Sequence, residues 1–232
     1  MRGSETTKVQ ARRPIRESHF WQAYNESRYA ILFYALLLTL FVIPAATTIG
    51  LPAFVLKLLL AASLFAAVMP NATPNSRYLF LAAAIALVVA SLVTEAGYLP
   101  VNSGLALALG GLVGLLAAAG ALRFTVKSRV VNSETVYAAL STYLLAGLFF
   151  GQIYWAIENI RPGSLTGPDP VTEVVTIYYS FVTLATLGYG DYLPRTDIAR
   201  GIATFEVIGG QLFLAVMVAR LIGAFGSAED DC

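Results

Sequence analysis

The chain has 232 residues, with 15 Lys and Arg against 14 Asp and Glu and a formal net charge of +1. Hydrophobic residues make up 57%, charged residues 12%, and the mean hydropathy is +0.70. A soluble domain needs more charged surface, so the composition predicts a membrane protein, and the near-neutral charge gives no sign of a nucleic-acid partner. With single residues Cys232 and His19, we expect neither a disulfide nor a Cys/His metal cluster. No nucleophile and base are visible, so we expect no enzyme and no cofactor.

Residues 1–29 form a polar, basic segment that contains no apolar stretch of signal-peptide type. Three aromatic residues, Phe20, Trp21 and Tyr24, lie near its end. We interpret the segment as a cytoplasmic N-terminal arm whose aromatic end lies at the lipid headgroups. Its basic residues are Arg2, Lys8, Arg12, Arg13, Arg16 and Arg28.

Four apolar segments follow, over residues 30–48, 51–69, 78–94 and 103–122. Each has close to the ~20 residues that a helix needs to cross the hydrocarbon core, and Gly, Pro and Asn residues separate them. We therefore predict a four-helix transmembrane domain over residues 30–122. Lys57 is the one basic residue inside these spans, and snorkelling or pairing is the simpler interpretation of it.

Residues 123–133 are a short basic linker with Arg123, Lys127 and Arg129. Asn132 or Ser133 is the expected cap of the next helix, with Glu134 in its first turn. The arm, the loop between the second and third spans, and this linker carry basic residues, whereas the other two loops carry none. Because basic residues favour the inner side, we predict a multi-pass protein of the cell membrane with both termini cytoplasmic.

Residues 134–226 have a different organisation. A helix is predicted over residues 135–157, with Tyr154 and Trp155 at its outer end, and another over residues 198–225, before a short tail at 227–232. Between them a short helix is predicted over about residues 171–185, capped by Asp169 and starting at Pro170, a good first-turn residue. It enters from outside and ends within the membrane, which is possible only where protein or water surrounds it.

The sequence TLGYGD follows that short helix, at residues 186–191. Two glycines around Tyr189 permit backbone conformations that other residues resist. The carbonyl oxygens of Thr186, Leu187, Gly188 and Tyr189, with the Thr186 hydroxyl, can then point to one axis and replace the water around K⁺. One strand cannot surround an ion, so several copies must meet on an axis.

This segment resembles the tetrameric potassium channels, whose filter usually reads TVGYGD after a pore helix with aromatics and a threonine, here Tyr178, Tyr179 and Thr183. The resemblance covers residues 134–226 well and the first 130 loosely. It implies an all-α membrane protein with six transmembrane helices, a re-entrant pore helix and a filter loop, in a voltage-gated-channel-like architecture. It also implies a homotetramer that conducts K⁺ passively in contact with membrane lipids. The implied filter residues are Thr186, Leu187, Gly188, Tyr189 and Gly190.

Voltage-gated relatives carry an arginine at every third position of the fourth helix, and the field acts on those charges. Residues 103–122 contain no Arg or Lys. We therefore interpret residues 30–122 as a sensor-like domain without voltage-sensing charges, so that a conventional arginine voltage sensor does not gate the pore.

The resemblance assigns further roles around the filter. Leu187 stands where valine is commoner, and Val182 stands where some relatives carry a glutamate that binds the aspartate after the filter. Asp191 therefore needs another partner, Tyr178 or Tyr179. The expected filter-supporting residues are Tyr178, Tyr179, Thr183, Asp191 and Glu206.

The last predicted helix, over residues 198–225, carries the residues that are expected to move when the pore opens and closes. Gly210 matches a hinge glycine of the family, and close packing is the alternative interpretation. The expected pore-lining residues are Gln211, Leu214, Val218 and Ile222, of which the last two could close the pore by dewetting. Glu206 is the acidic residue within this helix. We expect it to support the filter by hydrogen bonding, and a protonation-dependent gate is the alternative.

One rival function remains in another class: a nonconducting membrane scaffold or regulatory channel subunit that keeps the pore fold. A secondary transporter is less consistent with the sequence, because the two halves show no paired broken helices.

Overall fold

The computed structural model describes residues 19–49, 114, 118, 119, 122, 123 and 132–229. The predicted spans at 51–69 and 78–94, most of the span at 103–122, and Lys57 lie outside the described residues. So do the first 18 residues of the arm and most of the linker. The six-span prediction is therefore compared with the structure only at its first span and over the C-terminal half of the chain.

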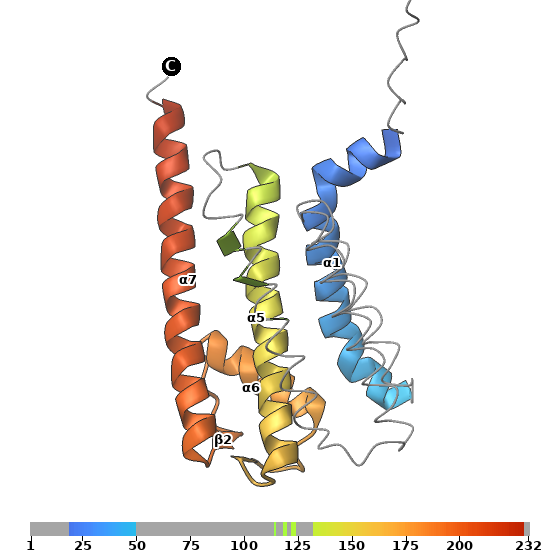
Figure 1. The fold of residues 1–232 in the computed structure, drawn as a ribbon, viewed down its shortest axis with the longest axis vertical. Helices are drawn as coiled ribbons and strands as arrows, with labels where there is room; N and C mark the ends of the chain where they lie inside the picture. The colour runs from blue at the N-terminus through green and yellow to red at the C-terminus, as the bar shows by residue number, and fades with distance from the viewer. Residues whose placement is uncertain (1–18, 50–113, 115–117, 120–121, 124–131, 230–232) are drawn as a thin grey trace, which may run out of the picture.

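The described part of the chain is mostly helical (Figure 1). Two of its helices are long and apolar enough to cross a membrane, one over residues 133–160 and one over residues 197–223. A shorter helix, Glu173–Leu184, lies across them. In chain order the elements are α1 (His19–Ile49), α5 (Ser133–Ile160), β1 (Leu165–Thr166), α6 (Glu173–Leu184), β2 (Leu193–Pro194) and α7 (Asp197–Glu229).

Helix α1 begins at His19, so the last residues of the predicted arm belong to the same helix as the first predicted span. Residues 19–43 contain neither Gly nor Pro, and nothing in that stretch interrupts helical hydrogen bonding. The face with Leu32 and Leu36 packs in one buried cluster with Leu145 and Leu148 of α5. Near this contact Glu134 accepts a hydrogen bond from the backbone N–H of Tyr29 at 3.2 Å.

Helix α5 begins at Ser133, two residues before the predicted start and directly after one of the two predicted caps. The side-chain oxygen of Asn132 accepts a hydrogen bond from the Thr135 N–H at 2.9 Å. This contact satisfies one of the N–H groups that a helix start leaves without an intrahelical partner. Asn132 is therefore confirmed as the cap, and the helix continues to Ile160, three residues beyond the prediction.

Helix α6 is shorter than predicted. It has 12 residues, which is about 18 Å and too short to cross a bilayer. The prediction that Asp169 caps it was wrong: Thr172 is extended, with φ −122° and ψ 169°, and its hydroxyl accepts from the Val175 N–H at 3.3 Å. A threonine hydroxyl placed directly before the first turn leaves Asp169 and Pro170 outside the helix.

Helices α5 and α6 approach each other closely. A Cβ on Gly151 of α5 would lie 2.7 Å from the Cα of Ile177 in α6, so only glycine permits this backbone separation. Gly147 and Tyr154 lie four residues before and three residues after Gly151, and such spacing puts all three on one face of α5. That face carries α6.

A pair of two-residue strands was not predicted. In β1 and β2 Leu165 lies opposite Pro194 and Thr166 opposite Leu193, antiparallel. Two residues are too few for an alternating pattern to be visible in the sequence. The pair joins the loop after α5 to the segment that precedes α7, so it holds both ends of the α6 region together.

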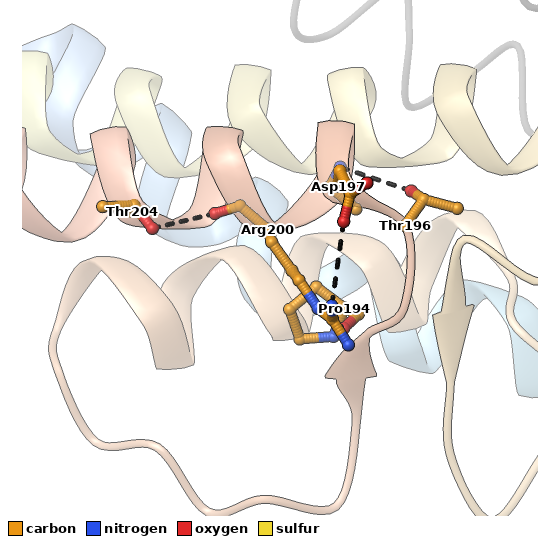
Figure 2. A network of polar contacts seen from close by, with 6 residues as sticks. Pro194, Thr196, Asp197, Arg200 and Thr204 are labelled. Carbon is orange, nitrogen blue, oxygen red and sulfur yellow. Dashed lines mark hydrogen bonds and ion pairs between the residues drawn. The ribbon is translucent and has the colours of Figure 1, made fainter.

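The start of α7 has a small polar network (Figure 2). Arg200 donates from Nε to the Pro194 carbonyl at 3.3 Å and lies 3.8 Å from Asp197. Thr204 donates to the Arg200 carbonyl at 2.9 Å. Because the ion pair is exposed, it stabilises the fold by at most about 1 kcal/mol. The hydrogen bond to Pro194 fixes where α7 begins relative to β2.

Candidate functional site

The segment Thr186–Gly190 leaves the C-terminal end of α6 and is exposed. Its first N–H groups bind back to the last turn of the helix. Thr186 donates to the Thr183 carbonyl at 2.9 Å, and Leu187 donates to the Val182 carbonyl at 2.9 Å. The Gly188 N–H reaches the same Val182 oxygen at 3.5 Å. The helix end therefore anchors the start of the segment.

These bonds fix the direction of the carbonyl groups. A trans peptide is planar, with its C=O pointing opposite to the N–H of the following residue, and the described residues contain no cis peptide. Since the N–H groups of Leu187 and Gly188 point to α6, the carbonyls of Thr186 and Leu187 point away from it. The segment therefore presents consecutive oxygen atoms on the side opposite α6.

The backbone of the segment alternates in handedness. Thr186, Gly188 and Gly190 have φ angles of 57°, 56° and 77°, whereas Leu187 and Tyr189 are not among the residues with positive φ. In a regular strand successive residues point to opposite sides. When every second residue has a positive φ, this reversal is lost and successive carbonyl groups can point to the same side. Thr186 was not expected here, since a β-branched residue resists this conformation at a cost of about 1–2 kcal/mol.

Helix α7 reaches the first residue of the segment. The Gln211 side-chain amide donates to the Thr186 hydroxyl at 3.3 Å. The neighbouring Gly210 is buried against the end of α6, where a Cβ would lie 2.7 Å from the Leu184 carbonyl oxygen. This contact favours the close-packing interpretation of Gly210, and its role as a hinge stays a prediction.

The residue after the segment has the partner that the sequence suggested. The Tyr178 hydroxyl donates to Asp191 Oδ2 at 2.8 Å. Tyr179, the other candidate, is buried and packs edge-on against Tyr154, with 4.9 Å between ring centroids. Thr183 contributes its backbone carbonyl to the segment through Thr186. The two neighbouring tyrosines therefore have different surroundings: Tyr178 is exposed and binds Asp191, whereas Tyr179 lies in the core, where its hydroxyl has Thr183 as a hydrogen-bond partner.

Removing the Tyr178 hydroxyl tests that brace. Tyr178→Phe loses one exposed hydrogen bond, so we expect a folded protein in which the segment Thr186–Gly190 is less constrained. The measurement follows from the filter role that the sequence predicts for this segment: ion flux into liposomes should decay faster than in the parent. Tyr192→Phe is the matched control, because the Tyr192 ring packs against Tyr178 and its hydroxyl has no hydrogen bond within the described residues. Equal decay in both variants would contradict the brace.

Glu206 lies fully buried between three helices. It accepts from the Tyr154 hydroxyl of α5 at 2.8 Å and contacts the Ser180 hydroxyl of α6 at 2.5 Å. Sequence reasoning missed both partners. Tyr154 was predicted at the outer membrane interface, yet its side chain is completely buried. Its spacing of seven from Gly147 was the available signal, since it places Tyr154 on the face that carries α6.

Only a narrow stripe of α7 is covered by the described residues. Ala199, Ala203, Glu206 and Gly210 are buried at three- and four-residue spacing. The predicted lining residues Gln211, Leu214, Val218 and Ile222 are all exposed. Other large apolar side chains of α7 are exposed as well, namely Ile198, Phe205, Ile208, Leu212 and Val216.

Comparison with known proteins identifies related chains over this part of the sequence. A family model described as an ion channel matches residues 138–226. The inward rectifier potassium channel Kirbac3.1 of Paramagnetospirillum magnetotacticum is 34% identical over 99 residues, which is 40% of this chain and 31% of that protein. The putative potassium channel protein YugO of Bacillus subtilis (strain 168) is 32% identical over 83 residues, 35% of this chain and 23% of that one.

A third relative, the putative potassium channel protein RPA4233 of Rhodopseudomonas palustris, is 39% identical over 49 residues. This match covers 21% of the present chain and 12% of the relative. The present chain thus spans less than a third of the length of each of the three. No solved structure matches the chain.

Proposed function

We propose that the chain forms a potassium-selective pore, because residues 138–226 match a family model described as an ion channel and the chain is similar to potassium channels. The pore conducts K⁺ passively down its electrochemical gradient. The permeant ions are held by oxygen atoms of Thr186, Leu187, Gly188 and Tyr189, with Gly190 completing the filter. Ion selectivity comes from oxygen atoms that take the place of the hydration shell.

The observation that carries this proposal is the direction of the Thr186 and Leu187 carbonyls. Their peptide N–H groups are held by the Val182 oxygen, so the oxygens face away from α6 without further adjustment. Fixed dipoles of this kind need little rearrangement when an ion arrives, which is the basis of preorganised binding. Alternating handedness at Thr186, Gly188 and Gly190 favours the same orientation in the next two residues.

A homotetramer supplies the missing sides of the ion site. One strand offers oxygen atoms from one direction only, and four identical strands around an axis enclose a cation. The exposed apolar surface of α7 supports this assembly, because a helix with so little covered surface needs protein or lipid against it. In the tetramer Gln211, Leu214, Val218 and Ile222 line the path below the filter.

The pore is oriented by the basic segments at residues 1–29 and 123–133, with both termini cytoplasmic and α6 entering from outside. The segment 103–122 contains no Arg or Lys, so the transmembrane voltage has no charge ladder to act on there. The opening signal therefore acts elsewhere than on a conventional voltage sensor.

Flux through purified protein tests the proposal. The full chain is reconstituted in liposomes, and K⁺ uptake is compared with Na⁺ uptake, with and without Ba²⁺, which has nearly the radius of K⁺ and twice its charge. We expect K⁺ uptake that exceeds Na⁺ uptake and that Ba²⁺ blocks. Native mass spectrometry should show four copies. Equal K⁺ and Na⁺ permeation, or an assembly without four copies, would contradict the proposal.

The alternative is a nonconducting scaffold or regulatory subunit with a pore fold. It predicts a folded assembly with no flux above that of empty liposomes under any condition. The preorganised carbonyls favour conduction, because a subunit that binds no ion gains nothing from the strained backbone at Thr186.

A further inference from the structure

Glu206 lies in a buried polar site whose contacts are with Tyr154 and Ser180 and not with the segment Thr186–Gly190. Its carboxyl is fully buried, and within the described part of the chain no Lys or Arg forms an ion pair with it. Among the described residues, the titratable groups that interact electrostatically with it are tyrosines, Tyr143 and Tyr154 from α5 and Tyr179 from α6. A buried carboxylate without a positive partner is strongly disfavoured.

The hydrogen atoms around Glu206 can be counted. The Tyr154 hydroxyl contacts Glu206 Oε2 at 2.8 Å, and the Ser180 hydroxyl contacts Oε1 at 2.5 Å. Ser180 Oγ also lies 2.7 Å from the Gly147 carbonyl oxygen. These three contacts need three hydrogen atoms.

The two hydroxyls supply only two of them, since each carries a single hydrogen. Gly147 presents a carbonyl oxygen, which can only accept, so the hydrogen between Ser180 and Gly147 must come from the Ser180 hydroxyl. Ser180 then accepts from Glu206. All three contacts form together when the third hydrogen is on the carboxyl group.

We propose that Glu206 is a neutral carboxylic acid in the folded protein and acts as a positioning residue for the filter. Its proton is donated to Ser180, the Ser180 proton goes to Gly147, and Tyr154 donates to the other carboxyl oxygen. This chain of hydrogen bonds connects α7 to α6 and both to α5. Ser180 lies six residues before Thr186, so the network fixes the helix from which the filter leaves.

Replacement by glutamine should preserve this arrangement. The amide of Glu206→Gln donates an N–H where the acid donated its O–H, and its oxygen still accepts from Tyr154. We expect Glu206→Gln to keep the melting temperature and the K⁺ flux of the parent. Glu206→Ala should lower both, because it leaves Ser180 without its donor, leaves Tyr154 without its acceptor, and opens a void. A Gln variant as damaged as the Ala variant would overturn the proposal.

Infrared spectroscopy of the full chain in liposomes at neutral pH provides a readout that does not depend on conduction. The parent should show the C=O band of a protonated carboxyl, and Glu206→Gln should lack it. Glu158→Gln is the matched control, since Glu158 accepts from the N–H groups of Gly163 and Leu165; this variant should keep the band. A parent spectrum without a band that depends on Glu206 would overturn the proposal.

A second variant covers the case in which Glu206→Gln does not fold. Tyr154→Phe removes the hydrogen bond to the carboxyl and should raise the frequency of the C=O band. An unmoved band would overturn the proposal. The functional part of this inference rests on the proposed channel activity, whereas the band does not. If K⁺ flux is present and the band is absent, the neutral state of Glu206 is refuted but the channel activity is not. If the band is present and K⁺ flux is absent, the channel activity is refuted but the neutral state of Glu206 is not.

Discussion

Gly188→Ala is expected to reduce K⁺ flux sharply and to weaken its selectivity while leaving the protein folded. Gly188 has φ +56°, where an L-residue with a Cβ is strained by about 1–2 kcal/mol. A Cβ at this position would meet no described atom within 4 Å beyond its chain neighbours, so the effect comes from the backbone and not from a clash inside one subunit. The strain is relieved by rotation of the peptide, which turns a carbonyl away from the ion.

The size of the effect follows from the free energy that is lost at the ion site. Every subunit carries the substitution, and a loss of about 1.4 kcal/mol at the ion site corresponds to about a tenfold slower passage. We therefore expect at least that reduction in K⁺ uptake by liposomes, with lower discrimination against Na⁺ in whatever flux remains.

Gly163→Ala is the matched control for this experiment. Gly163 has φ +84°, and a Cβ on it would contact none of the described residues beyond its chain neighbours; it lies in the loop between α5 and β1. The two substitutions therefore impose similar backbone strain at different places. If Gly163→Ala reduced the flux as much as Gly188→Ala, the loss would reflect general destabilisation and the assignment of Gly188 to the filter would fail.

Some features of the site were predictable because they depend on residue types at fixed short spacing. TLGYGD predicted a special backbone after a short helix, and the glycines do adopt positive φ. The absence of glutamate at Val182 predicted a new partner for Asp191, and Tyr178, on the short helix just before the filter, has its hydroxyl on that carboxylate. In each case the signal is local in the chain.

Other features depend on contacts between distant residues and leave little trace in the sequence. Tyr154 resembles an interfacial aromatic until α6 is placed against it, and Thr186 carries no mark of its left-handed backbone. The choice of Thr172 over Asp169 as helix cap is of the same kind. Both are good capping residues, and the position of α6 against α5 decides between them.

Gly210→Ala is expected to destabilise the protein and to reduce flux. The new Cβ would lie 2.7 Å from the Leu184 carbonyl oxygen and 2.8 Å from its Cδ1, and overpacking of this kind costs about 1–3 kcal/mol. Leu184 ends α6, and a single residue separates it from the segment Thr186–Gly190. A shift of its carbonyl therefore moves Thr186, which Gln211 contacts from the same helix as Gly210.

The sign of the stability change separates close packing from a hinge. A hinge glycine with free space would gain about 1 kcal/mol of helix stability on replacement by alanine, so the melting temperature would rise while opening was impaired. Close packing predicts a lower melting temperature. Gly209→Ala is the matched control, because a Cβ on Gly209 would meet no described atom within 4 Å beyond its chain neighbours and its own helix backbone; this variant should keep or raise the melting temperature. A rise in both variants would refute the packing role of Gly210, since a glycine that α6 needs for close approach cannot accept a methyl group without cost.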